Sequence, residues 1–238
     1  MLVTFFYRQE NYFFLLIISI ITVFLFLTIY GAFQIKWNYF VDSINKGNGN
    51  AICFTFDDGP DPELTPKILE ILETEKIKAA FFVIGNKVEM YPHIVKDLHN
   101  KGHVIANHTY CHSNKIALFS SGELKNDIEK CSRAIQNAIG QPSTLFRPPY
   151  GVTTPRYRKV LKQLKLKSIG WSLRSFDTMM KSKKQLTERV TRLIAPGSII
   201  LMHDNRPITL SSLPDIISHC KKNGIKIASF KELTGLNT

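Results

Sequence analysis

The chain has 238 residues, of which 44% are hydrophobic, and a formal net charge of +12 at pH 7. This length and composition predict one globular domain with a sizeable core plus an extra segment, and they exclude a collagen-like or disordered chain. The charge favours anionic partners such as lipid headgroups or acidic polymers, but no nucleic-acid-binding motif accompanies it, so we expect no nucleic-acid partner. The four cysteines contain no Cys-x-x-Cys pair and do not indicate a disulfide framework.

The first fifty residues contain one long uncharged run, from Tyr12 to Phe33, rich in Phe, Leu, Ile and Val. At ~1.5 Å per residue, a helix of this run crosses a hydrocarbon core of ~30 Å. We therefore expect an N-terminal tail over residues 1–11 and a transmembrane anchor over residues 12–33. Residues 34–50 are more polar and end in Gly-Asn-Gly-Asn, which is typical of a flexible linker.

These features predict a single-pass membrane protein that contacts the membrane through its N-terminal helix. We expect the main domain to be extracytoplasmic, although Arg8 and Lys36 flank the run on opposite sides and leave its orientation open. A cleaved signal peptide is the alternative, but its apolar region is normally shorter.

Residues 51–238 alternate short apolar runs with amphipathic stretches of helix length. The expected strands are Ile52–Phe56, Ala79–Val83, His103–Ala106, Thr144–Phe146, Ser168–Ser172, Ser198–Met202 and Lys226–Ser229. The expected helices are Thr65–Thr74, Tyr91–Lys101, Gly122–Ile139, Pro155–Leu164, Lys183–Ile194 and Leu213–Asn223. Strands that are apolar on both faces and alternate with helices indicate parallel βαβ units. The pattern predicts an α/β fold, a distorted barrel of about seven parallel strands, in one domain over residues 51–238.

Polar residues of types that can bind a metal or transfer a proton follow several of these strands directly. Two carboxylates, Asp57 and Asp58, follow the first strand, and His203 follows the sixth. Asn107-His108 follow the third strand and Arg147 the fourth. Because the carboxyl ends of parallel strands meet on one face of a barrel, we expect these side chains to form one site.

The carboxylates and two histidines indicate a metal site. Two adjacent carboxylates at the end of a buried strand repel each other, and a bound cation relieves that cost. His108 and His112 have the i, i+4 spacing that places two imidazoles on one face of a helical turn. Two imidazoles and one carboxylate suit zinc and leave positions for water and substrate. Cys111 is an alternative ligand.

Two further motifs suggest catalytic roles. In Arg147-Pro148-Pro149-Tyr150-Gly151 the prolines stiffen the backbone, so that the arginine can orient a carboxylate and the Tyr150 amide can stabilise an oxyanion. His203 at the end of an apolar strand can act as a general acid near neutral pH.

Together the motifs T-F-D-D-G, N-H-T-x-x-H, R-P-P-Y-G and L-M-H-D resemble the polysaccharide deacetylase family with its NodB-homology domain, over essentially all of residues 51–238. The resemblance implies a distorted barrel and a hydrolase that removes N-acetyl groups from a cell-wall or exported polysaccharide. The metal, zinc or another divalent cation such as cobalt, would be bound by Asp58, His108 and His112.

The same resemblance implies the remaining roles. Asp57 would be the general base toward metal-bound water, oriented by Arg147. The Tyr150 amide would stabilise the oxyanion, and His203 would protonate the leaving amine. A family carboxylate expected three residues after Trp171 is replaced here by Arg174.

We expect Asp177 to take over that carboxylate's role from later in the loop. Arg174 is then a candidate contact to an anionic part of the substrate, and Trp171 is a candidate wall of the acyl pocket.

Three alternatives remain at this point. The substrate could be a lipid-linked amino sugar that is deacylated or deformylated at the membrane. The domain could be a catalytically silent glycan-binding module, although such a module has no need of a base, a metal set and an acid together. Two imidazoles and a carboxylate also bind iron in non-haem oxygenases, but the βα order and the adjacent Asp57 favour hydrolysis.

Overall fold

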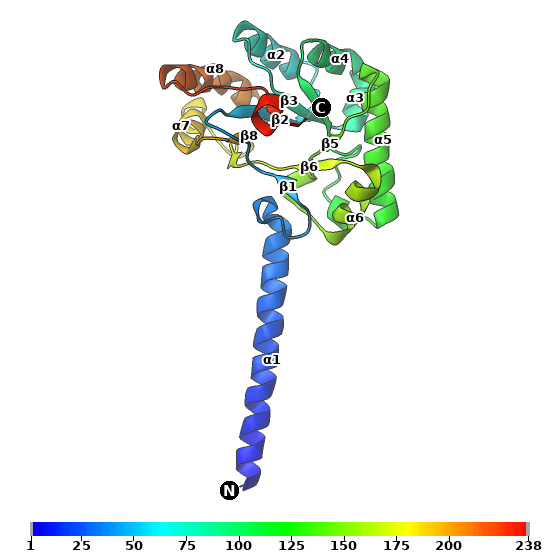
Figure 1. Ribbon diagram of the computed structural model, residues 1–238, viewed down its shortest axis with the longest axis vertical. Coiled ribbons are helices and arrows are strands. Elements are labelled where there is room, and N and C mark those ends of the chain that lie inside the picture. The colour runs from blue at the N-terminus through cyan, green and yellow to red at the C-terminus, as the bar shows by residue number, and fades with distance from the viewer. Residues whose placement is uncertain (1, 237–238) are drawn as a thin grey trace.

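The computed structural model describes residues 2–236. A long helix, α1 (Leu2–Phe33), projects from an α/β domain, and the 3₁₀ helix η1 (Ile35–Trp37) connects the two (Figure 1). Within α1, Tyr12–Phe33 is long and apolar enough to cross a membrane, and none of its most apolar 18-residue stretch is buried in the protein. Length and composition alone do not separate a membrane span from a signal sequence.

The domain is built on one parallel sheet of eight strands, in the order β1-β6-β5-β4-β3-β2-β8-β7. The strands are β1 (Ser43–Ile44), β2 (Cys53–Gly59), β3 (Ala80–Val83), β4 (Val104–Asn107), β5 (Leu145–Phe146), β6 (Lys167–Ile169), β7 (Leu173–Arg174) and β8 (Ile199–His203). Within the described residues β1 does not pair with β7, so the sheet curls without closing. This agrees with the expected distorted parallel barrel.

Helices surround the outer face of the sheet (Figure 1). They are α2 (Leu64–Thr74), α3 (Gly85–Met90), α4 (Pro92–Asn100), α5 (Ser121–Ile139), α6 (Pro155–Leu164), α7 (Lys183–Leu193) and α8 (Pro207–Lys222). The short elements are η2 (Ile116–Leu118), η3 (Pro149–Gly151) and the C-terminal helix α9 (Phe230–Thr234).

The alternation of side chains along β2 divides the core into two layers. Phe54 and Phe56 point outward and pack with the helices, whereas Cys53 packs inside the curled sheet. Phe230 of α9 also packs inside the curled sheet. Since Thr55 and Asp57 alternate with the outward phenylalanines, both polar side chains are directed to the interior side at the end of the sheet where the strands finish.

The structure differs from the expected elements in several places. Helices α3 and α9 were not expected, and α8 begins at Pro207 rather than at Leu213. Lys226–Ser229 is not a strand, because only Ile227 pairs, through an isolated bridge to Ile52. Two short strands, β1 and β7, were not anticipated. The segment expected to be a linker is partly folded, since Ile35 and Val41 are buried and β1 pairs with β6.

Candidate active site

Asp57 and Asp58 lie at an irregularity at the end of β2. The register against β3 shifts between Asp57 and Gly59, and Asp58 has a φ of 72°. A left-handed residue at a bulge changes the direction of the following side chain, so strand alternation no longer sends the two carboxylates to opposite faces. Both carboxylates line the same cleft.

His108 and His112 lie on the loop that follows β4, and this loop corrects one expectation. The residues between them are not helical, because Thr109 has a φ of 68° and His112 a φ of 45°. A loop with left-handed residues, and not a helical turn, therefore brings the two imidazoles together. Asp127 of α5 holds this loop in place by accepting hydrogen bonds from the backbone amides of Tyr110, at 2.8 Å, and Cys111, at 3.2 Å.

The loop brings both imidazoles to Asp58. The Nε2 atoms of His108 and His112 lie 3.5 Å and 3.2 Å from Oδ1 of Asp58, and the ligand atoms of all three residues lie within 4.8 Å of one another. Nδ1 of His108 lies 2.8 Å from the carbonyl oxygen of Arg147, and donating there leaves a lone pair on Nε2 directed to the cluster. Cys111 is exposed and does not belong to this group.

The protonation states of this cluster suit a cation. Burial, with the nearby charge of His108, lowers the pKa of His112 to about 4, so this imidazole is neutral at pH 7. Burial works against ionisation of Asp58, but its contacts with the imidazoles of His108, His112 and His203 outweigh burial and hold the pKa of this carboxyl below its usual range. A carboxylate and neutral imidazole nitrogens are the donor set that zinc accepts.

Arg147 is fully buried and is bound on several sides. Its Nη1 atom donates to Oδ1 of Asp57 at 2.6 Å and to the hydroxyl of Thr55 at 2.8 Å. Nε and Nη2 donate to the carbonyl oxygens of Ile169 and Gly170. The guanidinium thus neutralises Asp57 and fixes its orientation, while the other oxygen of Asp57, Oδ2, stays 3.8 Å from Nε2 of His108.

His203 lies on the opposite side of the cluster and is held by Asp177. Its Nδ1 lies 2.7 Å from Oδ1 of Asp177, whose Oδ2 accepts from the His203 amide and from the hydroxyl of Thr209. Burial disfavours the charged imidazole, but the hydrogen bond and charge of Asp177, with those of Asp57 and Asp58, raise the pKa of His203 overall. The second ring nitrogen, Nε2, lies 4.0 Å from Oδ2 of Asp58.

The cluster forms one side of a cleft of about 230 Å³. The other predicted residues, Tyr150, Trp171 and Arg174, line this cleft as well. Sequence reasoning did not single out Arg206 and Thr178, which also line it. No motif marks these two residues, and only the folded loops bring them to the cleft.

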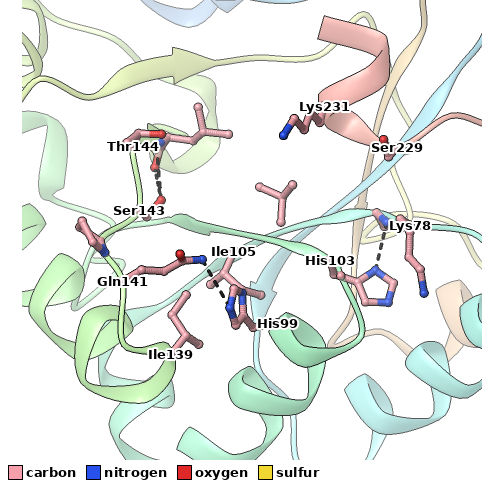
Figure 2. Close-up of a pocket in the computed structure, with 15 residues that line it drawn as sticks. Lys78, His99, His103, Ile105, Ile139, Gln141, Ser143, Thr144, Ser229 and Lys231 are labelled. Carbon is pink, nitrogen blue, oxygen red and sulfur yellow. Dashed lines mark hydrogen bonds between the residues drawn. The ribbon is translucent and has the colours of Figure 1, made fainter. Parts of the chain in front are cut away.

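A separate cavity of about 340 Å³ lies at the opposite ends of the strands (Figure 2). It is lined by residues at the starts of β3, β4 and β5, including His103 and Lys78, and no carboxylate is among the described residues that line it. His103 accepts a hydrogen bond from the Ala79 amide, and burial lowers its pKa to about 4. A neutral histidine bonded to backbone in this way is a core residue, so this cavity lacks the donor set of the first cleft.

The cleft therefore gathers three kinds of group around one point. A carboxylate and two imidazoles form a donor set for a divalent cation, a second carboxylate lies beside them, and an imidazole with a raised pKa stands across from them. Hydrolysis of an amide needs an activated water, a proton acceptor and a proton donor for the leaving nitrogen. This geometry can supply all three.

Comparisons with known proteins agree on one family. A family model described as polysaccharide deacetylase matches residues 44–169. A peptidoglycan-N-acetylglucosamine deacetylase of Bacillus cereus is 34% identical over 190 residues, which cover 78% of this chain and 69% of the relative. The family match includes Asp57, Asp58, His108 and His112 but ends before Trp171 and His203.

Two solved structures have the same fold. A crystal structure of a peptidoglycan N-acetylglucosamine deacetylase superposes with a TM-score of 0.77 at 32% identity and covers 82% of this chain and 94% of that chain. A CE4 family pseudoenzyme from Bacillus anthracis superposes with a TM-score of 0.75 at 29% identity and covers 81% of this chain and 68% of that chain. The fold therefore occurs both in a protein described as a deacetylase and in one described as a pseudoenzyme.

Proposed function

The chain belongs to the polysaccharide deacetylase family, a family of carbohydrate deacetylases, and on this premise we propose that it is a metal-dependent enzyme that removes N-acetyl groups from the N-acetylglucosamine residues of a cell-wall glycan. The observation that carries the proposal is the meeting of Asp58, His108 and His112 beside Asp57, with His203 across the cleft. A glycan-binding module has no use for this arrangement of donor set, base and acid.

The cation would be held by Asp58, His108 and His112. Support comes from the spacing of their ligand atoms and from the hydrogen bond that turns the lone pair of His108 Nε2 toward the cluster. When bound, the cation would polarise the acetyl carbonyl and lower the pKa of water to ~7. Zinc suits the donor set, and cobalt or another divalent cation is an alternative.

The protein's own groups would move the protons. Asp57 Oδ2, left free while Oδ1 is bound by Arg147, takes a proton from the attacking water. The hydroxide adds to the carbonyl carbon, and the Tyr150 amide donates to the oxygen that becomes negative. His203, whose charged form is favoured by the hydrogen bond and charge of Asp177, delivers a proton from Nε2 to the sugar nitrogen. The C–N bond then breaks to leave acetate and a free amine.

We further propose that α1 anchors the enzyme in a membrane with the catalytic domain on the extracytoplasmic side. The apolar span Tyr12–Phe33 and its exposure support an anchor, and a cell-wall substrate lies outside the membrane. Trp37 and Tyr39, just beyond the span, are exposed aromatics of the kind that lie at membrane interfaces.

The experiment is a test of acetate release by the purified full-length protein. In detergent, it should release acetate from N-acetylglucosamine oligomers and from peptidoglycan fragments after incubation with zinc or cobalt. A chelator should abolish the release, and added metal should restore it. Activity that survives complete metal removal would reject the metal, and no release from any N-acetylated glycan would favour a silent module like the described pseudoenzyme.

A further inference from the structure

A third cavity, of about 360 Å³, lies where the end of α1 meets the catalytic domain. Phe33, Gln34 and Lys36 line it from the end of the anchor, and Arg174 and Arg189 line it from the domain. It lies outside the metal cluster, because none of the cluster's carboxylates or imidazoles is among its described lining residues.

The cavity is strongly cationic. Lys36, Arg174 and Arg189 contribute three positive charges, no carboxylate is among the lining residues, and none of the three cations forms an ion pair within the described part of the chain. Lys36 donates only to the carbonyl oxygen of Ser172, at 2.5 Å, and Arg189 to backbone carbonyl oxygens. Three uncompensated cations around one cavity favour an anionic ligand with several acceptor oxygens, such as a phosphate.

This cavity adjoins the catalytic cleft. Trp171 and Arg174 line both of them. The guanidinium carbon of Arg174 lies 5.8 Å from the centre of the Trp171 ring, so the cation and the ring together form the wall between the two spaces. A ligand in the cationic cavity would therefore sit next to a substrate in the cleft.

The same cavity lies at the membrane end of the domain. The carbonyl oxygen of Ala32, in the last turn of α1, accepts a hydrogen bond from the amide of Thr153, in the loop that follows Tyr150. Figure 1 shows α1 projecting from the domain as a straight extension. If α1 spans the bilayer, the cationic cavity opens at the headgroup level, where phosphates of membrane lipids lie.

We propose that the cationic cavity binds the phosphate or diphosphate of a lipid-linked amino sugar whose N-acetyl group lies in the catalytic cleft. The proposal rests on the proposed deacetylase function and names its substrate class. In a 2-acetamido sugar, the carbon that carries the amide is bonded to the anomeric carbon, so a phosphate on the anomeric carbon lies beside the scissile bond. Arg174 lines both the cleft and the cationic cavity, so it could contact this phosphate while the amide lies in the cleft. The lipid chain would remain in the bilayer that holds α1.

The experiment uses the full-length protein in phosphatidylcholine vesicles with three N-acetylglucosamine substrates. The first is linked to a polyprenyl diphosphate, the second is UDP-N-acetylglucosamine, which has the same diphosphate without the lipid, and the third is a neutral oligomer. Lys36→Gln and Arg189→Gln remove one cavity charge each. Arg192→Gln, which removes an exposed charge from the same helix as Arg189 but outside the cavity, is the matched control.

We expect the polyprenyl diphosphate substrate to have the lowest KM. Lys36→Gln and Arg189→Gln should raise this KM roughly tenfold, the usual effect of losing a charge-assisted hydrogen bond, and should leave kinetics on the neutral oligomer unchanged, while Arg192→Gln alters neither. Because Arg189 also supports the backbone of the Arg174–Ser175 segment, Lys36→Gln decides the result if Arg189→Gln melts at a lower temperature.

Activity on the neutral oligomer with no preference for the lipid-linked sugar would overturn this proposal and leave the deacetylase function intact. A preference for UDP-N-acetylglucosamine over the lipid-linked sugar would overturn the claim that the bound phosphate belongs to a lipid. Equal losses from Lys36→Gln and Arg192→Gln would overturn the cavity as the binding site. Failure with all three substrates would instead reject the proposed function itself.

Discussion

Arg147 Nη1 donates a hydrogen bond to Asp57 Oδ1 at 2.6 Å, and both side chains are buried. The guanidinium makes three further hydrogen bonds, to Thr55 and to two backbone carbonyl oxygens. A buried charge with this many partners is costly to replace by a group that cannot reach them all. The pair therefore supports both the fold and the orientation of the expected base.

Arg147→Lys should destabilise the protein and impair catalysis. A lysine ammonium cannot reproduce the planar set of donors, so we expect a loss of about 2–4 kcal/mol in the free energy of unfolding and a large fall in kcat. Urea unfolding and acetate release measure the two effects. Arg158→Lys, an exposed change on α6, is the control and should alter neither. Wild-type stability in Arg147→Lys would contradict the buried network.

Asp57→Asn should separate catalysis from metal binding. Asparagine can still accept the hydrogen bond from Arg147 but cannot take a proton, so kcat should fall by roughly 10²–10⁴ while bound metal is retained. Metal content by elemental analysis and acetate release check this, and Asp58→Asn should lose metal in the same assay. If Asp57→Asn also lost its metal, Asp57 would be a ligand rather than the base.

Asp177→Asn should move the alkaline limb of the pH–rate profile. Asp177 raises the pKa of His203, and the acid role needs the protonated imidazole, so activity falls as pH rises through this raised pKa. Without the carboxylate the pKa of His203 drops, and the falling limb should shift to lower pH. Profiles of kcat from pH 5 to 10 measure the shift. A lower rate with an unmoved limb would mean that Asp177 only supports the loop.

Gly151→Ala should disturb the cleft through Trp171. Gly151 has a φ of 72°, and an added Cβ would lie 2.5 Å from the Trp171 ring. Gly140 has a φ of 78° with nothing within 4 Å, so Gly140→Ala reports the backbone strain alone, about 1 kcal/mol. Gly151→Ala should lose more stability than this control and should raise KM. Urea unfolding, tryptophan fluorescence and kinetics compare the two, and identical effects would reject the contact.

Removal of α1 should release the enzyme from membranes, but the position of the cut matters. A chain of residues 34–238 keeps buried Ile35 and Val41 and strand β1, whereas residues 51–238 lose all three. We expect both to leave the membrane fraction and the longer one to melt at a clearly higher temperature. Sedimentation with vesicles and thermal unfolding test this. A 34–238 protein that still sediments with lipid would contradict anchoring by α1.

Much of the fold and the site could be predicted because the relevant signals are local in the chain. Apolar runs that alternate with amphipathic stretches indicate parallel βα units, and polar residues just after the runs must meet at one end of the sheet. This logic places Asp58 and His108 in one site without any coordinates. The uncharged apolar stretch from Tyr12 to Phe33 likewise predicted a long helix that is separate from the α/β domain.

Other features depend on contacts between distant segments. Strand β1 has two residues and no recognisable pattern, so only its pairing with β6 makes it a strand. Lys226–Ser229 has the composition of a strand but finds one partner residue, Ile52, and does not extend the sheet. Spacing alone suggested a helical turn from His108 to His112, yet the carboxylate of Asp127 stabilises a loop there.

The sequence by itself identified the candidate site residues, because each motif lies within a few residues and its position at a strand end follows from the alternating pattern. Only the tertiary structure decided how these residues are oriented and charged. The pairing of Asp177 with His203 and the cationic cavity at Lys36, Arg174 and Arg189 join segments far apart in the chain. Hydrogen bonds, burial and electrostatic potential depend on distances in space, and no local pattern encodes those distances.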